Sequence, residues 1–131
     1  MEQSYNRLFV ISAMVSFIFM ASGEITLEKV TDDQTINGGE SATYDLTITN
    51  LDTNNPVSVT YSLSDQDAYM SYVTRGPPTL DASGEAVVRL VVNAIPSTPT
   101  GDYSNSVIAT PASGSPQAVA VNTHVICAYG C

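Results

Sequence analysis

Two cysteines near the end of the sequence are the side chains with the most specific chemistry. Cys127 and Cys131 are the only cysteines in the chain, and Ala-Tyr-Gly separates them. In an extended strand their Cα atoms would be about 13 Å apart, beyond the roughly 7 Å that a disulfide bridges. A bridge therefore requires a tight turn, which Gly130 permits. We expect a small disulfide loop that stabilises the tail locally rather than the whole domain.

The same cysteines have two other possible uses. They could form disulfides between subunits, or they could join His124 as three ligands of a metal site. A zinc site needs a fourth ligand, which this part of the sequence lacks. The metal site is therefore the weakest of the three interpretations, and we expect neither a metal nor a cofactor.

Acid–base chemistry has few candidates, because the chain holds a single histidine. The sequence has no Gly-x-Ser-x-Gly elbow, zinc-protease motif or phosphate-binding loop. Asp65 and Asp67 could seed a calcium site together with Asp102, but a hard cation needs six to eight oxygen ligands. A solvated acidic loop is the favoured interpretation. We expect no catalytic residues, and we predict that the chain is not an enzyme.

An uncharged apolar segment precedes the rest of the chain. Leu8 to Gly23 reads LFVISAMVSFIFMASG. As a helix it would be about 24 Å long, short of the roughly 30 Å hydrocarbon core of a bilayer. That length favours a secretory leader, and Ala21 and Gly23 fit a small-residue cleavage site before Glu24. We therefore treat residues 1–23 as a separate hydrophobic signal or assembly helix.

The alternative is that this helix is retained. It would then be buried between subunits, because its apolar side chains cannot stand in water. In either case the segment would meet a membrane only during export or assembly. The predicted assembly residues are Leu8, Phe9, Val15, Phe17 and Phe19.

The charge balance is strongly acidic. Four basic residues face 13 acidic ones, which gives a net charge of −9. Removal of residues 1–23 takes away Arg7 and Glu2, so the remainder keeps 3 − 12 = −9. Nucleic-acid binding requires clustered Lys and Arg, so this class of partner is excluded.

From Glu24 onward the sequence alternates between apolar and polar residues, as β-strands do. Seven such runs with short connections are typical of an immunoglobulin-like β-sandwich of about seven antiparallel strands. A small β-barrel is the alternative. We assign the sandwich to residues 24–126 and a cysteine-containing tail to 127–131. The predicted strands cover residues 25–30, 42–49, 57–63, 69–73, 86–93, 103–110 and 118–126.

Several motifs resemble those of a known group of domains. Gly39-Glu40-Ser41 leads into the strand Tyr44 to Asn50, and a Pro-rich bend from Ile95 ends in Gly101-Asp102-Tyr103. This order is similar to the CARDB and NEW3-type Ig-like modules of bacterial and archaeal surface proteins. The similarity covers residues 25–126 and implies the fold, but it says little about function. The whole-chain layout resembles archaeal pilin and archaellin subunits.

Tyr103 has a predicted structural role. It follows Gly101 at the start of the sixth predicted strand, which is the position of a tyrosine corner. In that motif the hydroxyl bonds to backbone upstream. We expect this role rather than a catalytic one.

These features predict an extracellular structural subunit of the cell surface, most simply a pilus-like filament protein. Its helix would lie in the core and its sandwich outside, and its partners would be copies of itself or other surface proteins. The alternative is a secreted binding or adhesion module for carbohydrate or protein, released by cleavage of residues 1–23. In that case exposed tyrosines such as Tyr69 and Tyr72 would stack on sugar rings.

Overall fold

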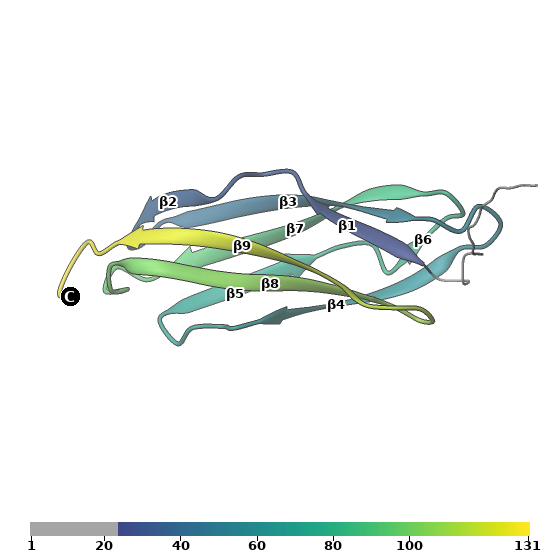
Figure 1. Ribbon diagram of the computed structural model, residues 1–131. Coiled ribbons are helices and arrows are strands. Elements are labelled where there is room, and N and C mark those ends of the chain that lie inside the picture. The colour runs from purple at the N-terminus through teal and green to yellow at the C-terminus, as the bar shows by residue number, and fades with distance from the viewer. Residues whose placement is uncertain (1–23) are drawn as a thin grey trace, which may run out of the picture.

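A computed structural model of the protein describes residues 24–131, in which nine strands form two packed sheets (Figure 1). One sheet has four strands in the order β1-β3-β7-β5, and the other has five in the order β2-β9-β8-β4-β6. The strands are β1 (Ile25–Lys29), β2 (Gln34–Asn37), β3 (Ser41–Asn50), β4 (Val57–Ser64), β5 (Met70–Arg75), β6 (Thr79–Leu80), β7 (Glu85–Ala94), β8 (Gly101–Pro111) and β9 (Gln117–Ile126).

The seven predicted strands correspond to β1, β3, β4, β5, β7, β8 and β9, so the all-β sandwich is confirmed. The expectation of about seven strands, all antiparallel, needs correction in two respects. The short strands β2 and β6 were not predicted, because four and two residues are too few to show an alternation. In addition, β2 runs parallel to β9, with Gln34 opposite Thr123.

Alternation along each strand explains the packing of the two sheets. In β3 the side chains of Ala42, Tyr44, Leu46 and Ile48 are fully buried, while the residues between them face outward. The neighbouring strand β7, which pairs with β3, shows the same alternation of buried and outward-facing side chains. Because side chains point to opposite faces in turn, each strand contributes one apolar row to a shared core. The other core residues include Val88, Leu90, Val92, Val107, Ala109, Val121 and Val125.

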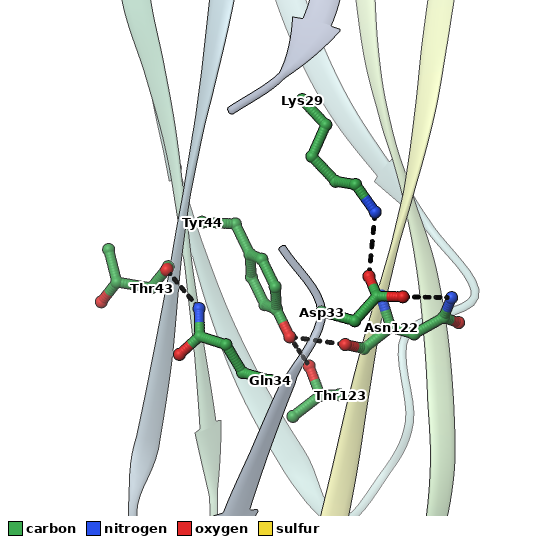
Figure 2. Close-up of polar contacts among 7 residues, drawn as sticks. All are labelled: Lys29, Asp33, Gln34, Thr43, Tyr44, Asn122 and Thr123. Carbon is green, nitrogen blue, oxygen red and sulfur yellow. Dashed lines mark hydrogen bonds and ion pairs between the residues drawn. The ribbon is translucent and has the colours of Figure 1, made fainter. Parts of the chain in front are cut away.

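The chain passes from one sheet to the other between β1 and β2, and polar contacts hold this crossover (Figure 2). The Asp33 carboxylate accepts hydrogen bonds from Lys29 Nζ at 2.9 Å and from the Asn122 backbone at 3.1 Å. Gln34 Nε2 donates to the Thr43 carbonyl at 2.6 Å. These bonds tie the crossover to β1, β3 and β9, which places β2 alongside β9.

The two ends of the described chain lie at opposite ends of the sandwich (Figure 1). Ile25 pairs with Asn50 at the end of β3, and Leu51 donates to the Glu24 carbonyl at 3.0 Å. Ile126 instead pairs with Asn37, next to the start of β3. We call the end that holds Glu24 the proximal end and the end that holds the tail the distal end.

The predictions for the N-terminal segment fall outside the described residues. They concern the helix over residues 1–23, its cleavage site and the assembly residues Leu8, Phe9, Val15, Phe17 and Phe19. Within residues 24–131, no helix is long and apolar enough to span a bilayer.

Candidate functional site

Three segments far apart in the sequence meet at the distal end, and together we call them the distal tip. They are the loop Asp65–Tyr69, the connection Ile95–Thr100 and the tail Cys127–Cys131. The Ile95 amide donates to the Tyr69 carbonyl at 3.4 Å, and the Tyr129 amide donates to the Pro96 carbonyl at 3.2 Å. The connection therefore lies between the loop and the tail and holds both of them.

Thr98 is the polar centre of the distal tip. Its side chain is fully buried, and its hydroxyl lies 3.0 Å from the Tyr69 carbonyl and 2.8 Å from the Ile95 carbonyl. One hydroxyl proton is shared between the two acceptors. Because a buried polar group is costly unless it is hydrogen-bonded, this arrangement holds the loop and the connection in one geometry.

Tyr103 fixes the other end of the connection. Its hydroxyl donates to the Pro99 carbonyl, four residues upstream, at 2.6 Å. Burial raises the pKa of this phenol, so the donor proton is retained through the neutral range. A tyrosine corner requires this contact with upstream backbone.

A disulfide between Cys127 and Cys131 closes the tail. Their Cα atoms are 6.2 Å apart, and Gly130 adopts a positive φ of 69°, which provides the turn. The Cys127 amide also donates to Thr100 Oγ1 at 2.9 Å. Because the thiols are used in this bond, the alternative metal site with His124 loses two of its three ligands.

Large apolar side chains are exposed on and beside the distal tip. Tyr129 is 75% exposed, Tyr69 is 47% exposed, and Ile95 and Ile126 are each 46% exposed. Tyr72, by contrast, is half-buried, and its hydroxyl accepts a hydrogen bond from the Asp67 amide at 3.1 Å. Of the two tyrosines proposed to stack on sugars, the structure therefore leaves only Tyr69 with an exposed ring.

A polar cleft of about 450 Å³ lies beside the tip on the five-stranded sheet. His124 Nδ1 and Asp102 Oδ1 are 2.7 Å apart across the β8–β9 pair. The Lys29 ammonium and the Asn122 amide lower the pKa of the Asp33 carboxyl in the same cleft. The lining residues are Asp33, Gln34, Thr35, Asp102, Asn122 and His124.

The carboxylates proposed for calcium have other roles. Asp67 Oδ1 accepts from the Tyr69 amide at 2.9 Å, and Asp65 contacts the Ser64 hydroxyl at 3.1 Å. Asp102 lies against His124 instead. In the part of the chain that the structure describes, no three His, Cys, Asp or Glu side chains are placed to share a metal ion.

Sequence reasoning missed the residues that connect distant segments. Thr98 looked like part of a Pro-rich bend, and His124 and Asp102 looked unrelated. Asp102 directly precedes the predicted strand 103–110 and His124 lies within the predicted strand 118–126, and only the register brings them opposite each other. The signal needed to find them was the pairing of strands, which no local pattern gives.

No protein-family model matches the sequence, and no curated protein sequence matches it significantly. The resemblance to CARDB and NEW3-type modules therefore stands at the level of the Ig-like fold alone.

Solved structures do match. The ASH/PapD-like domain 7 of human CEP192 is 16% identical, with a TM-score of 0.57 over 91% of this chain and 97% of that chain. A family 123 glycoside hydrolase from Clostridium perfringens is 10% identical, with a TM-score of 0.61 over 79% of this chain. Domains 4 and 5 of the S-layer protein SbsC give a TM-score of 0.45 at 14% identity, over 76% of this chain and 44% of that chain. The likeness to the CEP192 domain shows a PapD-like, Ig-like sandwich fold for the described residues.

The likeness to the hydrolase contradicts the prediction that the chain is not an enzyme. This fold occurs within a chain that hydrolyses glycolipid glycans, and our chain spans 27% of that protein. The absence of known catalytic motifs excludes only the active sites that those motifs mark, so the prediction that the chain is not an enzyme does not follow from it. At 10% identity the likeness shows the fold and assigns no reaction to this chain.

Proposed function

We propose that the protein is a structural subunit of the cell surface that presents its distal tip outward. The observation that carries this proposal is the placement of Glu24 and Cys131 at opposite ends of the sandwich (Figure 1). The apolar segment Leu8 to Gly23 joins the sandwich at Glu24. A subunit held by that segment would extend its tip away from the point of attachment.

The construction of the tip supports an exposed position. A disulfide persists in oxidising compartments, which include the cell exterior. The rings of Tyr69 and Tyr129 are exposed, but their backbone is held in place. Thr98 hydrogen-bonds to the Tyr69 carbonyl, and Tyr129 lies inside the loop that the disulfide closes. A rigid apolar surface of this kind loses little conformational entropy when it binds a partner.

The specific form that we propose is a pilus-like filament. Residues Leu8 to Ala21 would pack between subunits in the core, and the acidic sandwich would face solvent. The archaeal pilin and archaellin subunits, which the whole-chain layout resembles, provide the precedent for this arrangement.

A second candidate function is a secreted adhesion module. It would arise by cleavage before Glu24 and would use the distal tip to bind carbohydrate or protein. The exposed ring of Tyr69 favours it, since aromatic rings stack on apolar faces of ligands.

The N-terminus of the protein isolated from its own cells distinguishes these forms. A chain that retains residues 8–23 in polymers visible by electron microscopy supports the filament. A soluble chain that begins at Glu24 supports the secreted module.

Orientation is tested with one epitope tag at two positions, on intact cells. One tag follows Cys131 at the distal tip, and its matched control replaces part of the proximal β8–β9 connection at residues 112–116. We expect antibody to reach the distal tag more readily. Equal access to both, or access to neither, would contradict the proposed orientation.

A further inference from the structure

Two arginines lie directly opposite each other on the outer face of the four-stranded sheet. Arg75 at the end of β5 pairs in register with Arg89 on β7, and Arg89 pairs in register with Asp45 on β3. Like charges at directly opposed positions destabilise a sheet, and opposite charges stabilise it. The row Asp45–Arg89–Arg75 therefore has one favourable neighbour pair and one unfavourable pair.

The two arginines differ in what they bind. Arg89 donates from Nε to Asp45 Oδ1 at 2.7 Å and from Nη2 to Oδ2 at 3.2 Å. For the Arg75 side chain, the described residues provide no hydrogen bond and no salt bridge. Arg89 thus uses Nε and Nη2 on Asp45 and keeps its other N–H groups, while among the described residues Arg75 keeps all its donors, in a chain with a net charge of −9.

These arginines line an open cleft of about 350 Å³ together with Gly76, Pro77 and Val87. One wall of the cleft is fixed, because Tyr61 Oη donates to the Pro77 carbonyl at 2.7 Å. A Cβ on Gly76 would lie 2.6 Å from Tyr61 Cζ, so the backbone rests directly on that ring. The cleft therefore combines two guanidinium groups with a firm apolar wall.

We propose that this arginine cleft binds a carboxylate of a second copy of the chain. A carboxylate placed between Arg75 and Arg89 would restore alternating charges along the row and could accept from both guanidinium groups. The lining offers no aromatic ring, amide or hydroxyl side chain, which are the groups that recognise sugars. An acidic peptide surface fits this chemistry better than an acidic polysaccharide.

The acidic partner that fits best is the loop Asp65–Tyr69 at the distal tip. Asp65 is exposed and stands at a left-handed turn with φ 60°, and within residues 24–131 its carboxylate contacts only the neighbouring Ser64 hydroxyl. Tyr69, exposed in the same loop, would lie against Val87 and Pro77 of the cleft. The contact would join the tip of one copy to the flank of the next, and such a head-to-side contact repeats into an open chain.

This inference rests on the proposed self-associating subunit, and opposed charge changes test it in solution. The full chain is compared with Arg75→Glu, Asp65→Lys and the control Ser58→Glu, which adds a negative charge at an exposed position on β4 in the other sheet. We expect sedimentation to show association weakened at least about tenfold in the first two variants and less than about twofold in the control. Asp65→Asn, which tolerates the left-handed turn, separates loss of charge from loss of fold.

Mixing supplies the decisive measurement. In an equimolar mixture of Arg75→Glu and Asp65→Lys, each tip–cleft contact between the two different variants has opposite charges, so association should return in alternating chains. Association of the single variants at wild-type strength, or a mixture that stays dissociated while both variants remain folded, would overturn the proposal. A monomeric wild-type chain would overturn it as well, and binding of the acidic polymer polygalacturonate through Arg75 would then identify an acidic polysaccharide as the ligand of the cleft. A failure here leaves the result of the cell-surface tagging unaffected, so the two proposals fail separately.

Discussion

Tyr44 of β3 and Thr123 of β9 join the two sheets through side chains that are both fully buried. Tyr44 Oη donates to the Asn122 carbonyl at 2.7 Å, and Thr123 Oγ1, 2.8 Å away, donates in turn to Tyr44 Oη (Figure 2). Burial raises the pKa of this phenol, so it keeps its proton. The contact fixes the distance between the sheets next to the crossover that places β2.

Replacement of Tyr44 by Phe should lower the free energy of unfolding by about 1–3 kcal/mol, because it leaves the part-buried Asn122 carbonyl and the buried Thr123 hydroxyl without this partner. Urea unfolding followed by circular dichroism measures the change. Tyr129→Phe is the matched control, since its ring is 75% exposed, and it should change stability by less than about 0.5 kcal/mol. Equal effects of the two substitutions would contradict a role for the hydroxyl contact.

Tyr103→Phe tests the corner at the distal tip. Loss of the bond to the Pro99 carbonyl should cost about 1 kcal/mol, because the acceptor is partly shielded from water. The thermal midpoint of the variant is compared with that of Tyr69→Phe, which removes an exposed hydroxyl from the same tip. An unchanged midpoint in Tyr103→Phe would rule out the corner as a stabilising contact.

The tail disulfide should contribute little to global stability. Loop-closure entropy for so short a loop is about 2 kcal/mol, and local opening of the tail after β9 can relieve even this. The double variant Cys127→Ser, Cys131→Ser should therefore unfold within about 2 kcal/mol of the parent chain. An intact mass under non-reducing conditions should show a monomer lacking two hydrogen atoms. Covalent dimers would instead indicate bridges between subunits.

Asp33 should make the crossover sensitive to acid. The hydrogen bond from Lys29, followed by those from Asn122, lowers the pKa of this carboxyl in the folded state. The stabilisation is therefore complete above its ordinary pKa and is lost as the pH falls through the lowered folded value. Urea midpoints of the parent and of Asp33→Asn should differ near neutral pH, begin to approach each other as the pH falls below about 4, and meet only below the lowered folded pKa. The adjacent change Asp32→Asn is the control, and the same convergence there would argue against a specific effect of Asp33.

Much of the fold could be predicted from alternation alone. Residues such as Ala42, Tyr44, Leu46 and Ile48 recur at every second position, and this period is written in the chain itself. The same local pattern could not reveal β2, because four residues with one buried side chain, Ile36, do not define a period. Its parallel pairing depends on Asp33 and Gln34 reaching β9 and β3, which are distant in the sequence.

The candidate sites were less predictable than the strands. The sequence identified Cys127, Cys131 and Tyr103 as residues of interest, since each has a chemistry or a neighbouring glycine that marks it. It gave no indication that Thr98 is buried between two carbonyl groups. It also suggested a broad exclusion of enzymes that the likeness to a glycoside hydrolase does not support.

The sequence by itself determined the positions of the seven main strands, the acidic balance and the residues available to form a disulfide. These properties follow from side-chain type and from a two-residue period, both of which are local. The tertiary structure alone decided that Arg75 pairs with Arg89 and that His124 pairs with Asp102. It also decided that the tail and Glu24 lie at opposite ends of the sandwich. Such relationships arise from the order, direction and register of strands, and a shift of one residue in the register of a strand would turn all of that strand's side chains to the other face.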